Sequence, residues 1–221
     1  MARPISASLI CSLIILCATS IAHADPVELL NFNHLGNLQP VGNFYNGGSS
    51  EAPNYGVSFS SNFYGLTSVQ QGGTGNFSPN LTHTPAIFIN GAAGSMVTGS
   101  MNVTSGFSSG VNFFYTAAFQ ETATVWSGAN GTGTVLATIT LAANDGSCSG
   151  SYCNWSDVGL SFSGTAQSVT FSGTANGIGI SDITLGQSTS LVTVPEPSSI
   201  YLLGTGLAGV CGYWARRLVR I

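Results

Sequence analysis

Short runs of alternating apolar and polar residues recur along the chain from residue 56 to residue 185, separated by Gly, Asn and Ser. A period of two places successive side chains on opposite faces of a strand, and turn residues at this spacing mark the connections between strands. No convincing long amphipathic helix lies between the runs, so the pattern predicts an all-β domain, a sandwich or a barrel. The expected strands are 56–61, 86–90, 100–104, 111–117, 123–126, 135–142, 158–162, 168–172 and 178–185.

The pattern specifies one hairpin in more detail. Residues 127–133 are rich in turn formers and connect two of the predicted strands, which gives a hairpin over 123–142. Residues 29–33 are expected to pair near the last strand, 178–185. In the second strand of the hairpin, alternation assigns Val135, Ala137, Ile139 and Leu141 to one face and Leu136, Thr138 and Thr140 to the other.

The N-terminus has the three parts of a secretory signal peptide. Arg3 precedes an apolar stretch over 5–18, and Ala22 and Ala24 form an A-x-A cleavage site before Asp25. An uncleaved anchor is the alternative, but polar residues interrupt the apolar stretch, which is also shorter than the roughly 20 residues of a spanning helix. We therefore predict that the signal peptide is residues 1–24 and that the mature chain begins at Asp25.

The C-terminus carries a motif, an apolar run and a basic cluster, in that order. Pro195, Glu196 and Pro197 separate the domain from the C-terminal segment, because two prolines continue neither a strand nor a helix. The apolar run over 200–214 is short for a membrane span, and we place the transmembrane helix at 198–215. By the positive-inside rule the chain end is cytoplasmic and the domain lies outside the inner membrane, oriented by Arg216, Arg217 and Arg220.

This order of parts resembles the PEP-CTERM sorting signal of Gram-negative bacteria, also known as the ice-binding-protein C-terminal domain. The resemblance covers the last 28 residues, 194–221, and implies recognition by an exosortase, a membrane cysteine enzyme. It also implies that the helix is a transient anchor, cleaved near Pro195–Pro197, and that the protein then reaches an exopolysaccharide-rich cell surface or biofilm matrix. A plain C-terminal anchor is the alternative.

The charge distribution excludes several classes of function. All four basic residues lie in the two terminal segments, so the domain over 25–193 contains seven acids and neither Lys nor Arg. It therefore has no electrostatic means of binding nucleic acid or anionic lipid, and phosphate chemistry is disfavoured. A neutral, weakly charged surface suits contact with polysaccharide or self-association.

Two cysteines remain in the mature domain. Cys148 and Cys153 are five residues apart in an exported chain, which predicts a disulfide that closes a small loop. A metal site on these two residues is the poorer alternative, because His34 and His83 are remote in the sequence.

The first and last strands of the domain resemble those of secreted jelly-roll domains, including many carbohydrate-binding modules. The resemblance implies a single antiparallel β-sandwich of jelly-roll type. It also implies a structural Ca²⁺ ion, with Asp182 as one ligand and Glu28 or Asn31 as N-terminal ligands. Calcium needs six to eight oxygen ligands, and a single Asp on a strand otherwise faces solvent.

We predict no catalytic residues. Gly106 to Gly110 match the G-x-S-x-G nucleophile elbow, but that motif needs a following helix, and here a strand is expected. Six acids could supply a glycosidase pair, and nothing selects one. Glu121 stands out beside aromatic residues but is expected to be an exposed strand carboxylate. Aromatic residues that could stack on sugars are Tyr64, Tyr115, Trp126, Tyr152 and Trp155, most of which are expected to be core residues.

The sequence therefore predicts a non-enzymatic surface or matrix protein that is exported, processed by exosortase and associated with exopolysaccharide. The alternative is a carbohydrate-binding module or carbohydrate-active enzyme with the same tail. A third hypothesis is an ice-binding face formed by a flat threonine array, based on the pairs Thr122 and Thr124, Thr132 and Thr134, and Thr138 and Thr140.

Overall fold

The computed structural model describes residues 28–80, 82, 84–146 and 152–189. The predicted signal peptide and the predicted transmembrane helix lie outside this part of the chain, so both stay predictions. Within the described ranges no helix has the length and apolar character to cross a membrane.

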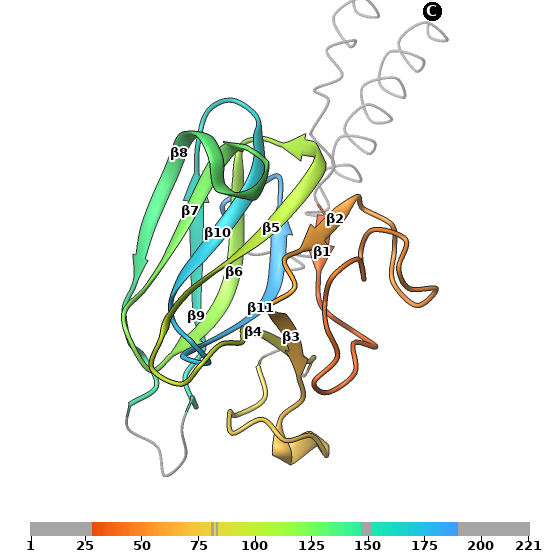
Figure 1. Cartoon of the computed structure of the whole chain (residues 1–221), viewed down its shortest axis with the longest axis vertical. Helices are drawn as coiled ribbons and strands as arrows, with labels where there is room; N and C mark the ends of the chain where they lie inside the picture. The colour runs from red at the N-terminus through yellow and green to blue at the C-terminus, as the bar shows by residue number, and fades with distance from the viewer. Residues whose placement is uncertain (1–27, 81, 83, 147–151, 190–221) are drawn as a thin grey trace, which may run out of the picture. The chain divides into compact units, whose positions relative to one another are not determined.

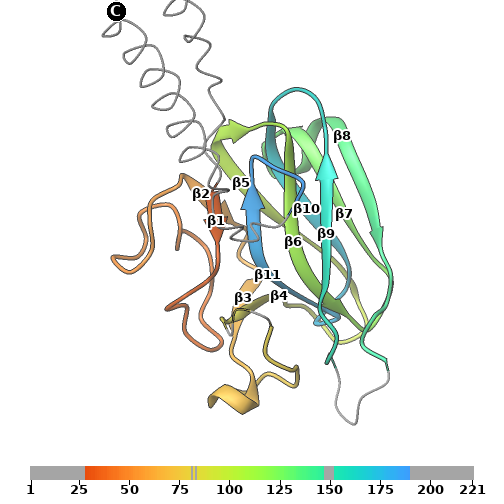
Figure 2. The same ribbon diagram turned by 180° about the vertical axis from the view of Figure 1, so that it is seen from behind.

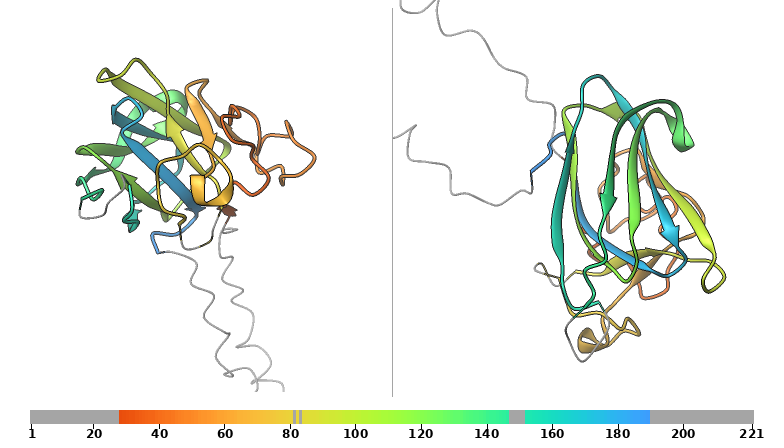
Figure 3. Two further views of the ribbon diagram at one scale, coloured as in Figure 1. Left: turned by 90° about the horizontal axis from the view of Figure 1, so that it is seen from below. Right: turned by 90° about the vertical axis from the view of Figure 1, so that its left-hand side faces the viewer.

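The described domain consists of two antiparallel sheets (Figures 1 and 2). Sheet A has the order β3-β4-β11-β6-β9, and β1 also pairs with β11, whereas sheet B has the order β2-β5-β10-β7-β8. Figure 3 shows these layers from two further directions. The elements are β1 (Glu28–Leu30), β2 (Val57–Phe59), β3 (Phe63–Leu66), η1 (Val69–Gln71), β4 (Ala86–Ile89), β5 (Met96–Phe107), β6 (Gly110–Ala117), β7 (Glu121–Gly128), η2 (Ala129–Gly131), β8 (Thr132–Leu141), β9 (Ser156–Ser161), β10 (Ala166–Thr174) and β11 (Ile178–Leu185).

The predicted all-β sandwich is confirmed, and so are several of its details. The last strand has the predicted bounds, and β1 pairs with it from Glu28↔Leu185 to Leu30↔Ile183. The hairpin of β7 and β8 forms around the turn-rich connection. The strand over 100–104 is longer than predicted, at twelve residues, and β3 was not predicted as a strand of its own.

The predicted faces of β8 need corrections at Val135 and at Leu136, which was assigned to the face of Thr138 and Thr140 but packs against the core. Leu141 is buried as predicted, but the register shifts between Val125 and Trp126, so that Val125 pairs with Ala137 and Trp126 with Val135. This bulge moves Val135 to the outer face together with Trp126, and the side chain is 48% exposed. Alternation does not continue through a bulge, because the bulge contains one unpaired residue.

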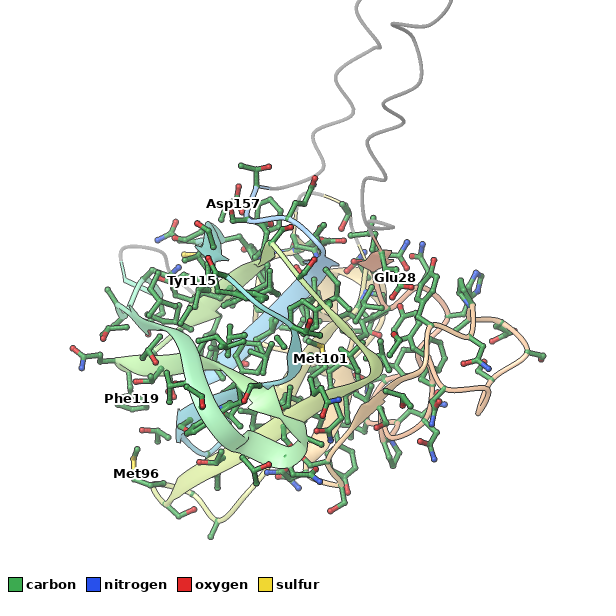
Figure 4. The ribbon with its side chains drawn as sticks, turned by 90° about the horizontal axis from the view of Figure 1, so that it is seen from above. Glu28, Met96, Met101, Tyr115, Phe119 and Asp157 are labelled. Atoms are coloured by element: carbon green, nitrogen blue, oxygen red, sulfur yellow. The ribbon has the colours of Figure 1, made fainter. Side chains whose placement is uncertain are left out.

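Aromatic rings fill the space between the two sheets. Phe171 of β10 meets Phe113 of β6 at a centroid distance of 5.2 Å and Phe63 of β3 at 6.2 Å, both edge to face. Gly99 of β5 makes room for Phe63, because a Cβ atom there would lie 2.3 Å from the ring. In Figure 4 Met101 lies at the centre of the molecule, whereas Met96 and Phe119 lie at its periphery.

Candidate functional site

The outer face of sheet A carries a cavity of about 210 Å³. Its lining includes Thr116 of β6, Gly179 of β11, Phe88 of β4 and, from the loops, Phe77 and Tyr152. Most of this lining is apolar, so the cavity resembles small-molecule sites, which combine apolar walls with a few polar groups.

The cavity exists because a glycine occupies the middle of a row of side chains that runs across the sheet. Tyr64 pairs with Phe88, Phe88 with Gly179, and Gly179 with Thr116. Paired residues project from the same face of a sheet, so the absent side chain at Gly179 leaves a hollow between Phe88 and Thr116. A glycine inside a strand often marks such a close approach.

Aromatic rings stand on both sides of this hollow. Phe88 contacts Tyr64 at a ring-centroid distance of 6.1 Å on one side. On the other side Phe77 and Trp155 meet edge to face at 5.8 Å, and a Cβ atom on Gly179 would lie 3.5 Å from the Trp155 ring.

Hydrogen bonds hold two of the aromatic side chains in place. The Trp155 indole N–H donates to the Ser78 carbonyl at 2.8 Å, and the Tyr152 hydroxyl donates to the Asn176 carbonyl at 3.1 Å. Since each side chain is fixed by a backbone carbonyl of another segment, the aromatic walls are positioned before any ligand arrives.

One polar group of the cavity has no partner. Thr116 is 1% exposed, and its hydroxyl oxygen makes no hydrogen bond within the structure. Burying a hydroxyl group without a partner costs about 1 to 3 kcal/mol, so buried polar groups are nearly always paired in folded proteins. The Thr116 hydroxyl oxygen is therefore a buried polar atom without a partner, and the Thr116 Cγ2 methyl, not this oxygen, lies against Gly179.

The outer face of sheet B is lined with hydroxyl groups in register. One row across the strands contains Thr98, Ser172, Thr122 and Thr140, and the next contains Ser100, Thr170, Thr124 and Thr138. The four threonines predicted from β7 and β8 thus share one face, whereas Thr132 donates its hydroxyl to the Ala129 carbonyl within the connecting turn. Several of these hydroxyl groups form hydrogen bonds with one another, as Thr98 and Ser172 do at 2.7 Å. The ice-binding hypothesis stays a prediction.

The aromatic residues that were singled out for sugar stacking separate into three groups. Tyr152 lines the cavity on sheet A, and Tyr64 and Trp155 contact rings beside it. Trp126 lies on the outer face of sheet B and donates to the Thr170 hydroxyl at 2.8 Å. Tyr115 is a core residue, 7% exposed.

The predicted calcium ligands come together only in part. The last pair between β1 and β11 is Leu30 with Ile183, so the next residues, Asn31 and Asp182, lie beside each other. Glu28 pairs instead with Leu185, three residues away from Asp182 along β11. Asp182 is 5% exposed, sits in a register shift with φ 49°, and accepts a hydrogen bond from the Thr82 hydroxyl at 2.7 Å.

One oxygen of Asp182 has no hydrogen-bond partner, and burial raises the pKa of the carboxyl group. The Asn31 side-chain oxygen already accepts a hydrogen bond from the Asn33 backbone N–H at 3.1 Å. No cluster of three His, Cys, Asp or Glu residues occurs among the described residues. Asp182 supplies one carboxylate where calcium needs six to eight oxygens, and the metal site stays a prediction.

The hydrolase motif forms a tight turn. Gly106 to Gly110 connect β5 directly to β6, with Gly106 and Ser109 at positive φ, so a strand follows the serine, as the sequence predicted. Ser108 and Glu28 border a second cavity of about 330 Å³, whose described lining contains no histidine. Among the described lining residues, therefore, no histidine lies beside Ser108 as it does in Ser-His pairs.

Glu121 is not the exposed carboxylate that the sequence suggested. It is 2% exposed, and one carboxylate oxygen accepts a hydrogen bond from the Thr174 backbone N–H at 3.2 Å. Gly173 and Gly177 make this burial possible, because Cβ atoms there would lie 1.0 Å and 2.9 Å from the carboxylate oxygens. Burial raises the pKa of Glu121 to about 7, although the Thr174 N–H acts in the opposite direction.

The remaining predicted site residues cannot all be placed. Cys153 is half-buried and disulfide-bonded, but Cys148 lies outside the described residues, so the pairing stays a prediction. The sorting motif and the arginine cluster also lie outside the described part: Pro195, Glu196, Pro197, Arg216, Arg217 and Arg220.

Solved structures with a loosely similar arrangement include two carbohydrate-binding modules. A family 29 module matches over 77% of this chain and 99% of its own, with 13% identity and a TM-score of 0.44. A module from Cellvibrio mixtus lichenase 5A in complex with cellotriose matches over 57% of this chain and 86% of its own, with 16% identity and a TM-score of 0.33. TM-scores this low place neither a ligand nor a site on this chain.

The sequence comparisons concern the C-terminal tail. No curated protein matches the chain. The family model of the PEP-CTERM protein-sorting motif matches residues 193–217, which include Pro195, Glu196 and Pro197. The chain therefore carries a PEP-CTERM protein-sorting motif at its C-terminus, as the sequence predicted.

Proposed function

We propose that this chain is a non-enzymatic surface or matrix protein that an exosortase processes and that associates with extracellular polysaccharide. The sorting motif over 193–217 carries the proposal, because it implies an exported substrate of exosortase. In this scheme the chain crosses the inner membrane, is held for a time by its C-terminal helix, and then reaches the cell surface or the extracellular matrix.

The chemistry of the domain supports a binding role. The domain over 25–193 has no Lys or Arg, so it offers no partner for phosphate or for an acidic polymer. The outer face of sheet B is lined with uncharged hydroxyl groups, and that of sheet A carries an apolar cavity with aromatic walls. Both faces suit a neutral, hydroxyl-rich partner better than a charged one.

The tail gives the direct test of the sorting step. In Glu196→Ala the apolar run is unchanged, so membrane insertion should proceed normally, because insertion depends on hydrophobicity and flanking charge. If exosortase recognises the motif, the full-length variant should accumulate in the membrane and surface protein should fall severalfold. The measurement is the C-terminal peptide of surface-extracted and membrane-bound protein, identified by mass spectrometry.

Two controls separate recognition from anchoring. Glu51→Ala removes an exposed carboxylate from the domain and should leave processing unchanged. Deleting Arg216, Arg217 and Arg220 should instead disturb membrane orientation, because it removes the charge that holds the C-terminus inside. An intact Ile221 terminus on surface protein from a host with exosortase would contradict the proposal and reduce the tail to an ordinary anchor.

A further inference from the structure

We propose that the strand β8 pairs in antiparallel orientation with β8 of a second copy of this chain, so that the two sheets B become one continuous sheet. The inference adds an interaction surface and a partner, and it does not depend on the proposed binding of polysaccharide. We name this surface the β8 edge and define it as the side of Thr132–Leu141 that faces away from β7.

The position of β8 leaves one of its sides without a neighbouring strand. Sheet B has the order β2-β5-β10-β7-β8, and Figure 1 shows β8 at the left-hand margin of the domain. In an antiparallel sheet, the backbone N–H and C=O groups of alternate residues point to opposite sides of a strand. About half of the β8 backbone groups therefore point away from β7. In the described part of the chain, no loop backbone group forms a hydrogen bond with β8.

The other three edge strands are protected against pairing. At β2 a loop covers the edge, because the Phe59 N–H donates to the Gly42 carbonyl at 2.8 Å. At β3 the Gly65 N–H donates to the Gln39 carbonyl, also at 2.8 Å. The fourth edge strand, β9, is six residues long and carries Asp157, and short length and charge both discourage strand pairing.

The β8 edge lacks these protections. The strand is ten residues long and contains neither a charged residue nor a proline. Natural proteins usually place a charge or a proline in such a strand, because an unprotected edge pairs with other chains. Residues 122–144 contain no charged residue at all, so two copies meet here without electrostatic repulsion. A second β8 is therefore a matching partner in both its backbone groups and its charge.

The inner face of β8 is incompletely covered. Ala137 pairs with Val125, and Ile139 pairs with Ala123. The two β7 residues are fully buried, whereas Ala137 and Ile139 are only half-buried although they pack against the same core. A further strand beside β8 would cover the exposed sides of both. A two-fold axis perpendicular to the sheet brings the same apolar residues of the second copy to this face.

Register and symmetry limit the size of this contact. The pairing of β8 with β7 is regular only from Ala137 to Leu141, and bulges twist the earlier part of the strand away. Because both copies use the same edge and the edge at β2 is covered, the assembly closes at two copies. A contact this short is smaller than a standard interface of roughly 1,600 Å², so the dimer is reversible.

The test places like charges at the β8 edge. Thr138 and Thr140 are exposed on the outer face, where they would meet the same two residues of the second copy. The double variant Thr138→Lys/Thr140→Lys should weaken the dimer about tenfold, because like charges on adjacent strands repel. Sedimentation equilibrium of the full mature chain, in density-matched detergent at low salt, measures the dissociation constant.

The matched control is the double variant Thr122→Lys/Thr124→Lys. These residues pair with Thr140 and Thr138, so the new charges lie in the same rows but one strand farther from the edge. The control should associate like the wild type. Lysine also lowers the net negative charge of a domain with seven acids and no Lys or Arg, so a general charge effect would strengthen association instead.

Complementary charges make the test decisive. Thr138→Glu/Thr140→Glu should weaken the dimer as the lysine variant does, and an equimolar mixture of the two variants should restore it, which also shows that both are folded. A wild type that stays monomeric up to about 1 mM would overturn the inference. A dimer that persists equally in all variants would also overturn it, and would assign association to another surface. Neither result affects exosortase processing, which the C-terminal peptide measures separately.

Discussion

Phe171→Ala should lower the free energy of unfolding by about 3 to 5 kcal/mol, the range for truncating a buried aromatic side chain. Phe171 is fully buried, and its ring meets Phe113 and Phe63 edge to face across the sandwich. Because Phe171 belongs to sheet B and its two partners to sheet A, the variant would leave a cavity in the contact that joins the layers.

Urea unfolding of the mature chain, followed by tryptophan fluorescence, measures this loss. Phe119→Ala is the matched control, because it removes the same ring from a position that is 52% exposed and should change stability by less than about 0.5 kcal/mol. Equal effects of the two substitutions would show that the Phe171 cluster does not hold the sheets together.

Alternation predicts strands such as β7, in which buried and half-buried positions alternate, whereas β6 and β11 are buried on both faces and were recognised as apolar runs bounded by turn residues. For β11 both predicted bounds are correct. In β3 alternation failed, since Phe63–Leu66 is only four residues long and includes Gly65, where a Cβ atom would lie 2.7 Å from the Leu35 side chain. In a strand this short, with a glycine that close packing requires, too few residues remain to show an alternation of apolar and polar positions.

The cavity on the outer face of sheet A could not be predicted from the sequence, because the order of the strands in a sheet does not follow from the local pattern of residues. Phe77, Phe88, Thr116 and Gly179 belong to a loop and three strands that become neighbours only through the order β4-β11-β6. One signal was available: Gly179 interrupts the alternating run 178–185, and a glycine within a strand often marks a hollow or a close approach.

Two register shifts and the burial of the Glu121 carboxyl group also could not be predicted from the sequence. The register shift at Asp182 and the one at Trp126 each change which face the following residues occupy. Glu121 was expected at the surface, because a carboxylate usually remains hydrated. Its burial depends on Gly173 and Gly177, more than 50 residues away in the chain, whose missing side chains make room for it.

This burial predicts that Glu121 destabilises the domain as the pH rises from about 4.5 to 7. The pKa of Glu121 is raised from 4.5 to about 7, mainly by burial, so the folded state holds a proton that the unfolded state has released in this window. The free energy of unfolding therefore decreases with rising pH, by at most about 3 kcal/mol, and is constant above the folded-state pKa. The domain has no Lys or Arg to stabilise the ionised carboxylate, and Tyr152 interacts electrostatically with both Glu121 and Asp145.

Glu121→Gln isolates this contribution, because the amide keeps the shape of the side chain and an oxygen that can accept from Thr174. Burial raises the pKa values of Glu28 and Asp182 as well, so the wild-type curve contains their contributions, and the difference between the two proteins does not. In urea titrations from pH 4 to 8, we expect the two proteins to converge near pH 4.5. The variant should become the more stable protein above pH 7. Parallel stability curves across the whole window would show that Glu121 titrates normally and is hydrated in solution.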